Sequence, residues 1–146
     1  MQINEDALEL VMDKQKIAEM VSNRAFYRDR REWDNLRNCF TPDGSIVTLF
    51  YTGPVDGFLE AVKKMNESKH LIANMQITVN QKRAICESST IFSGRIKLNN
   101  MDADMTVFCR VFDFFEKDND KNWHIKKRVV DYEKDRIDPI GLRGLL

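Results

Sequence analysis

The pattern of apolar and polar positions divides the chain into an N-terminal helical part and a C-terminal part made of strands. Residues 7–29 contain neither Gly nor Pro, and a spacing of about 100° per residue gathers their apolar side chains on one broad stripe. This spacing predicts an amphipathic helix that buries one side. The stripe comprises Leu10, Val11, Ile17, Ala18, Val21, Ser22, Ala25 and Phe26, whereas the opposite side carries Asp13, Lys16, Asn23 and Tyr27.

Shorter elements are expected to follow. We predict a helix over residues 30–39 that faces Trp33, Leu36 and Phe40 inward, a turn at Thr41–Gly44, a strand over 45–51 and a helix over 55–65. The second half predicts long strands over 70–79, 83–98, 103–116 and 123–133. Strands of that length must twist and bend in a small domain.

Helices that are segregated from consecutive antiparallel strands indicate the α+β class. We therefore expect a cone-shaped α+β barrel, in which a long N-terminal helix packs in a strongly curved, mostly antiparallel sheet with one interior pocket. The length of 146 residues predicts a single domain over residues 1–146, with 135–146 as a C-terminal tail. Apolar side chains of this tail could cover the pocket mouth or a neighbouring subunit: Ile137, Ile140, Leu142, Leu145 and Leu146.

Charge and cysteine content narrow the functional classes. Lys plus Arg and Asp plus Glu number 23 each, so the formal net charge is zero, which argues against nucleic acid or a membrane surface as partner. No apolar run approaches the roughly 20 residues of a membrane helix, and no signal-peptide pattern opens the chain. Cys39, Cys86 and Cys109 show no paired spacing, so we expect small buried thiols in a reducing, cytoplasmic compartment.

Established catalytic and cofactor motifs are absent. The sequence contains no GxSxG, HExxH, P-loop or GxGxxG pattern, and its two histidines and three cysteines lack the spacing of zinc ligands. We therefore expect neither a metal nor a cofactor. His124 lies between two apolar residues of the last strand and is interpreted as a surface residue.

Asp29 is the first candidate for chemistry, because the helical period places it near the middle of the predicted apolar stripe. A carboxylate there costs free energy unless other groups satisfy it. Two explanations stay open: Asp29 and Glu32 match a capping box at the start of the second helix, or Asp29 belongs to a functional site.

His70 is the second candidate. Strand alternation places it on one face with Ile72, Asn74, Gln76 and Thr78, while the other face is wholly apolar. His70 is therefore expected on the polar face, either in solvent or lining a mixed cavity.

These segments carry a family resemblance over residues 7–139. YRDRREWDNLRNCFTPDGSI, KHLIANMQITV, RAICESSTIF and WHIKKRVVDYEKDRIDPI resemble the SnoaL-like branch of the nuclear transport factor 2 superfamily, especially relatives of scytalone dehydratase and lindane dehydrochlorinase. In those enzymes an aspartate at the end of the long helix and a histidine at the start of a strand form a dyad in the pocket. The resemblance implies these roles for Asp29 and His70, and turns the His70 and Asn74 face toward the cavity.

The sequence also departs from that family. The second pocket histidine of scytalone dehydratase has no counterpart in residues 88–95, so the resemblance does not imply the same substrate. The candidate substrate-binding residues are Asn74, Tyr51, Trp33, Phe26 and Arg110. Asn74, Tyr51 and Arg110 each have a structural alternative, which for Arg110 is an ion pair with a surface acid.

The expected function is that of an acid–base enzyme without metal or cofactor, which acts on a small, mostly apolar cyclic molecule as a dehydratase, another eliminating enzyme or an isomerase. The alternative is a non-catalytic module, either a ligand carrier or the small subunit of a larger enzyme. Apolar residues on the outer sheet face, among them Phe108, Phe112 and Phe114, predict a homodimer or homotrimer.

Overall fold

The fold combines three helices with one curved sheet of six strands. The computed structural model describes residue 2 and residues 4–140. The helices are α1 (Glu5–Asp29), α2 (Trp33–Asn38) and α3 (Val55–Val62). The strands are β1 (Phe40–Val47), β2 (Thr52–Pro54), β3 (Ser68–Asn80), β4 (Arg83–Leu98), β5 (Met101–Lys117) and β6 (Trp123–Pro139).

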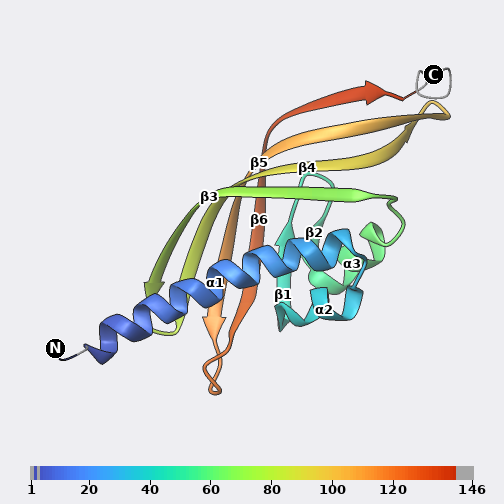
Figure 1. Ribbon diagram of the computed structural model, residues 1–146. Coiled ribbons are helices and arrows are strands. Elements are labelled where there is room, and N and C mark those ends of the chain that lie inside the picture. The colour runs from blue at the N-terminus through green and yellow to red at the C-terminus, as the bar shows by residue number, and fades with distance from the viewer. Residues whose placement is uncertain (1, 3, 141–146) are drawn as a thin grey trace.

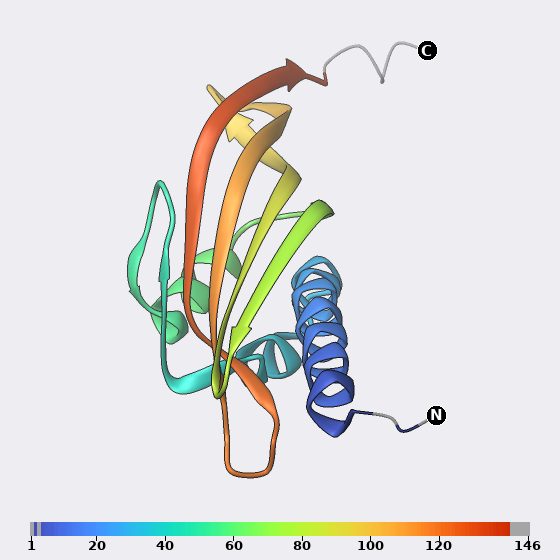
Figure 2. The ribbon, with the colours of Figure 1, turned by 90° about the vertical axis from the view of Figure 1, so that its left-hand side faces the viewer.

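The sheet has the strand order β2-β1-β6-β5-β4-β3, in which only β1 and β6 pair in parallel. The long helix α1 runs beside β3, while α2 and α3 lie near β1 and β2 (Figures 1 and 2). The expected α+β fold, with a long helix against a strongly curved and mostly antiparallel sheet, is confirmed. No helix in the described part of the chain is long and apolar enough to cross a bilayer.

The core fills the space between the helices and the sheet. It is formed by side chains from α1, α2, α3 and the inner sheet face, with Ile17, Val21, Leu36, Val55, Val62, Cys86, Phe115 and Ile125 almost fully buried. All three cysteines are buried and free, as expected. The far ends of β4, β5 and β6 rise beyond the helices (Figure 2).

A β-bulge in β3 changes which side chains face inward. Ala73 pairs with Ser89 but Gln76 pairs with Glu87, so two residues of β3 lie opposite one residue of β4. Asn74 sits in this bulge with a φ of 52°, a conformation that asparagine adopts more readily than most residues. His70 and Ile72 face inward before the bulge, whereas Met75, Ile77 and Val79 do so after it.

The predicted buried stripe of α1 is wrong in part. Leu10, Val11 and Phe26 are 42%, 63% and 54% exposed, whereas Asp13, Arg24 and Arg28 are buried. Asp13 is satisfied by Trp123, whose indole Nε1–H donates to it over 2.9 Å, and by the Lys117 ammonium at 3.0 Å. The buried face of α1 therefore mixes the apolar residues Ile17, Val21 and Ala25 with charged ones.

Two predicted boundaries also differ. β1 begins at Phe40 and includes the expected turn at Thr41–Gly44, because this segment pairs irregularly with β6. β6 continues to Pro139, so residues 135–139 of the expected tail form strand, and Ile137 is 43% exposed there. Leu142, Leu145 and Leu146 lie outside the described residues.

Candidate active site

The carboxylate of Asp29 and the imidazole of His70 meet where α1 ends beside the start of β3. His70 Nδ1 lies 2.6 Å from Asp29 Oδ1, and the backbone N–H of His70 donates to Asp29 Oδ2 over 2.9 Å. The Ser68 hydroxyl donates to Asp29 Oδ1 over 3.0 Å. Both carboxylate oxygens of Asp29 therefore form hydrogen bonds with residues of β3.

This arrangement tests the capping explanation for Asp29. The N-cap of α2 is Glu32, and α2 has no side-chain cap hydrogen bond. The capping explanation is therefore wrong, because the Asp29 carboxylate is used by β3 and not by amides of α2.

Burial and hydrogen bonding set the charges of the pair. Burial lowers the pKa of His70 to about 4, against a smaller opposing effect of the hydrogen bond to Asp29. Burial would raise the pKa of Asp29, but its hydrogen bonds with His70 and Ser68 outweigh that effect and leave it below its usual value. At neutral pH the imidazole is therefore neutral and the carboxylate ionised. Since an ionised carboxylate only accepts, Nδ1 carries the proton and Nε2 has a free lone pair.

A cavity of about 100 Å³ lies inside the cone, and His70 forms part of its wall. The ring of Phe92 meets the His70 ring edge-on, with centroids 5.1 Å apart. The rest of the wall is mostly apolar and comes from β1, the segment after it, α3 and the inner faces of β5 and β6: Ile46, Phe50, Phe58, Val62, Met65, Met105, Val107, Cys109, Val111, Val130 and Tyr132. The volume suits a small molecule.

Three arginines are the cations of this wall. Arg128 donates to both oxygens of Asp113 over 2.8 and 2.7 Å. Arg28 contacts the Ser68 hydroxyl at 3.4 Å and lies over the Trp33 ring. Arg24 is 4% exposed, and burial lowers its pKa to about 9. Residues 2 and 4–140 contain no group of three or more His, Cys, Asp or Glu side chains that could hold a metal ion.

Three of the predicted substrate-binding residues do not line this cavity. Asn74 is exposed because the bulge turns it away from the inner face, which corrects the expectation that it shares a face with His70. Phe26 is 54% exposed under the Arg30 guanidinium and lines a separate surface hollow between α1 and β3, together with Asp29 and His70. Trp33 packs against the core beneath Arg28.

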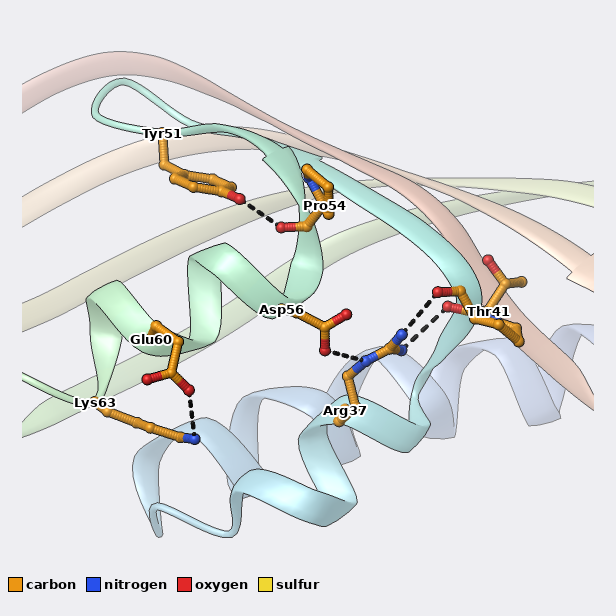
Figure 3. A network of polar contacts seen from close by, with 8 residues as sticks. Arg37, Thr41, Tyr51, Pro54, Asp56, Glu60 and Lys63 are labelled. Carbon is orange, nitrogen blue, oxygen red and sulfur yellow. Dashed lines mark hydrogen bonds and ion pairs between the residues drawn. The ribbon is translucent and has the colours of Figure 1, made fainter.

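Tyr51 and Arg110 are likewise engaged elsewhere. The Tyr51 hydroxyl donates to the Pro54 carbonyl over 2.6 Å, in the region where Arg37 also joins α2 to α3 through Asp56 (Figure 3). Its neighbour Phe50 lines the cavity instead. Arg110 is on the outer sheet face, 3.3 Å from Glu133, in agreement with its structural alternative.

Several residues of the site were missed by the sequence analysis. Arg24 and Arg28 lie seven and eleven residues after Ile17, a helical spacing that places them on its face. Ser68 precedes His70 by two residues and so shares its strand face. The predicted apolar stripe includes neither arginine, although their spacing from Ile17 indicates the same face of the helix.

Comparison with known proteins identifies the family of the chain. The chain is 27% identical over 142 residues to an uncharacterized protein of Emericella nidulans, covering 90% of this chain but only 60% of that relative's length. A candidate scytalone dehydratase from Novosphingobium aromaticivorans has a similar structure, with a TM-score of 0.73, 18% identity and coverage of 90% and 95% of the two chains.

A hexachlorocyclohexane dehydrochlorinase from Novosphingobium barchaimii superposes with a TM-score of 0.78, at 14% identity and with coverage of 92% and 94%. At such identities these two structures establish a shared fold. The model of the SnoaL-like domain matches residues 9–129, which is most of the chain. This protein therefore belongs to the SnoaL-like domain family.

Proposed function

We propose that the cavity is the active site of an acid–base enzyme in which His70 Nε2 accepts a proton from the substrate. The observation that carries this proposal is the 2.6 Å contact of the Asp29 carboxylate with the opposite ring nitrogen, at the wall of an apolar cavity. The carboxylate holds the ring in the tautomer that leaves Nε2 free, and it stabilises the imidazolium once the proton has arrived.

The protonation state of His70 supports the role of proton acceptor, although its lowered pKa also makes the imidazole a weaker base. Because burial keeps the imidazole neutral at pH 7, the base is available without prior loss of a proton. The same proton can then be returned to another atom of the substrate. Proton removal beside a leaving group gives elimination, and return of the proton to a different carbon gives isomerisation, so both reactions are compatible with this site.

The cavity wall supports a small, mostly apolar and cyclic substrate. Phe50, Phe58 and Phe92 present aromatic surface, and aliphatic side chains of β5 and β6 complete the enclosure. Exclusion of water from such a space strengthens the electrostatic effect of Asp29 on a developing imidazolium. The names of the two similar structures denote a dehydratase and a dehydrochlorinase, which favours elimination over isomerisation.

The experiment is a turnover screen with small cyclic β-hydroxy and β-halo carbonyl compounds, followed by the absorbance of the conjugated product. For a compound that is turned over, we expect His70→Asn to lower the rate about 10²–10⁴-fold. His124→Asn is the matched control, since His124 contacts Asp118 away from the cavity, and it should retain full activity. Full turnover by His70→Asn would reject the proposal.

A further inference from the structure

We propose that the natural ligand of the cavity carries a carboxylate group that binds the Nε–Nη2 edge of Arg24. This inference rests on the proposed function for the position of the reacting group. It goes further by assigning a charge and a binding residue to the substrate.

The first observation is an unsatisfied guanidinium. Arg24 is 4% exposed and lines the cavity. Its Nε and Nη2 atoms are buried and find no hydrogen-bond partner anywhere in residues 4–140. An arginine buried without partners is costly, and native proteins satisfy nearly all such groups. The cost is explained if a ligand supplies the acceptors.

The second observation is which edge of the guanidinium is free. Nε and Nη2 lie side by side and donate in parallel, which matches the two oxygens of a carboxylate. The same edge is used elsewhere in this protein: Arg95 Nε and Nη2 contact Asp104 Oδ1 and Oδ2 at 3.0 and 3.4 Å. Arg24 therefore presents to the cavity the same pair of donors with which Arg95 binds the carboxylate of Asp104.

The third observation is the charge of the cavity wall. Arg128 is paired with Asp113, and Arg28 lies beside Asp29 and Ser68. Arg24 is left as the positive charge without its own carboxylate. A ligand with one negative charge compensates it, whereas a dianion would add uncompensated charge.

The wall also offers a hydroxyl near His70. Thr90 lines the cavity, and its Oγ1 is buried without a hydrogen-bond partner among the described residues. Thr90 pairs with Ile72, two residues from His70 on the adjacent strand, so its hydroxyl is on the same inner face. Arg24 and Thr90 thus provide donors for a polar group of the ligand, while the aromatic wall holds its ring.

A bound carboxylate would also change the base. The charge of Arg24 is one of the causes that lower the pKa of His70. Neutralising that charge raises the pKa of the imidazole and makes it a stronger proton acceptor in the complex than in the free protein. Binding of the ligand would then itself increase the basicity of His70.

The experiment compares cyclohexanecarboxylate and benzoate with their uncharged amides, cyclohexanecarboxamide and benzamide. Binding to the complete protein is measured by thermal shift and calorimetry. We expect each carboxylate to bind wild type at least about tenfold more tightly than its amide, because only the carboxylate can accept two charged hydrogen bonds from Arg24. Arg24→Met should abolish this preference without lowering the melting temperature of the free protein, since it removes an unpaired buried charge.

Arg110→Gln is the matched control, because Arg110 lies on the outer face, and it should keep the preference. If Arg24→Met does not fold, Arg24→Lys retains the charge without the paired donors and should still weaken the carboxylates about tenfold. Equal binding of acids and amides to wild type, or a preference that persists without Arg24, would overturn the inference. A carboxylate preference that depends on Arg24, in wild-type protein that turns over no compound of the screen, would uphold the inference and reject the proposed function.

Discussion

Replacing Asp29 with Asn tests how the carboxylate controls the imidazole. The variant keeps one carbonyl oxygen, which can still accept the His70 backbone N–H now held at 2.9 Å. Its amide group then faces His70 Nδ1, where the carboxylate oxygen lies at 2.6 Å in wild type. An amide N–H donates, so Nδ1 must become the acceptor and the proton must move to Nε2. The variant is thus expected to place a proton on Nε2, the nitrogen that accepts the substrate proton in the proposed mechanism.

The magnitude follows from the contacts that are lost. A hydrogen bond to a charged group contributes about 1.5–3 kcal/mol to stability. In Asp29→Asn, the hydrogen bond with the His70 ring no longer involves a charged group. With the pair only 9% and 15% exposed, solvent screening is weak. We expect a loss of about 2 kcal/mol in the free energy of unfolding. For a domain of this size that is about 4–8 °C in melting temperature.

The tautomer is read from the ¹⁵N chemical shifts of the His70 ring near pH 7, and stability from denaturant unfolding. Asp118→Asn is the control, because Asp118 contacts the other histidine, His124, and its substitution should leave the His70 ring unchanged. An Nε2–H tautomer in wild type, or an Nδ1–H tautomer in Asp29→Asn, would refute the reasoning.

Three further outcomes are expected. The pKa of His70 falls from 6.5 to about 4 on folding, so protonation of the imidazole favours the unfolded state. We therefore expect the free energy of unfolding to fall by up to about 3 kcal/mol as the pH is lowered from 6.5 to 4. Urea titrations should show a smaller decrease for His70→Gln. Asp113→Asn leaves Arg128 without its charged partner and should cost about 3–5 kcal/mol, much of which the double variant with Arg128→Met should restore, as measured by chemical unfolding. Phe114 is 40% exposed on the outer sheet face, where we expect a dimer or trimer interface. Phe114→Lys should then shift sedimentation at micromolar concentration toward the monomer. Wild-type protein that already sediments as a monomer would contradict the expectation.

The long elements were predictable because their signals are local. The boundaries of β4 agree with the prediction at both ends, and the helix ending at Asp29 has its expected C-terminus. The meeting of Asp29 and His70 was anticipated only through the family resemblance. They lie 41 positions apart in the sequence, and no periodicity within either segment indicates which strand a helix will pack against.

The failures concern residues whose environment is decided by tertiary contacts. Alternation puts Asn74 on the face of His70, which the resemblance turns toward the cavity, but a single inserted residue reverses the alternation. The helical phase puts Asp13 on the side opposite the apolar stripe, but Asp13 is buried and Trp123 and Lys117 satisfy it inside the protein. Arg110 was a pocket candidate although its side chain points to the opposite face of the sheet, which depends on the register of β5.

The bulge in β3 also has a consequence for how this protein can evolve. It divides one strand into two stretches with separate inward positions: His70 lines the cavity, whereas Ile72 before the bulge and Met75, Ile77 and Val79 after it pack against the core. Selection for a new substrate can alter the first stretch while the second preserves the scaffold. Deletion of Asn74 would remove the bulge and restore regular alternation along β3. The inward side chains of one of the two stretches would then point to the outer face.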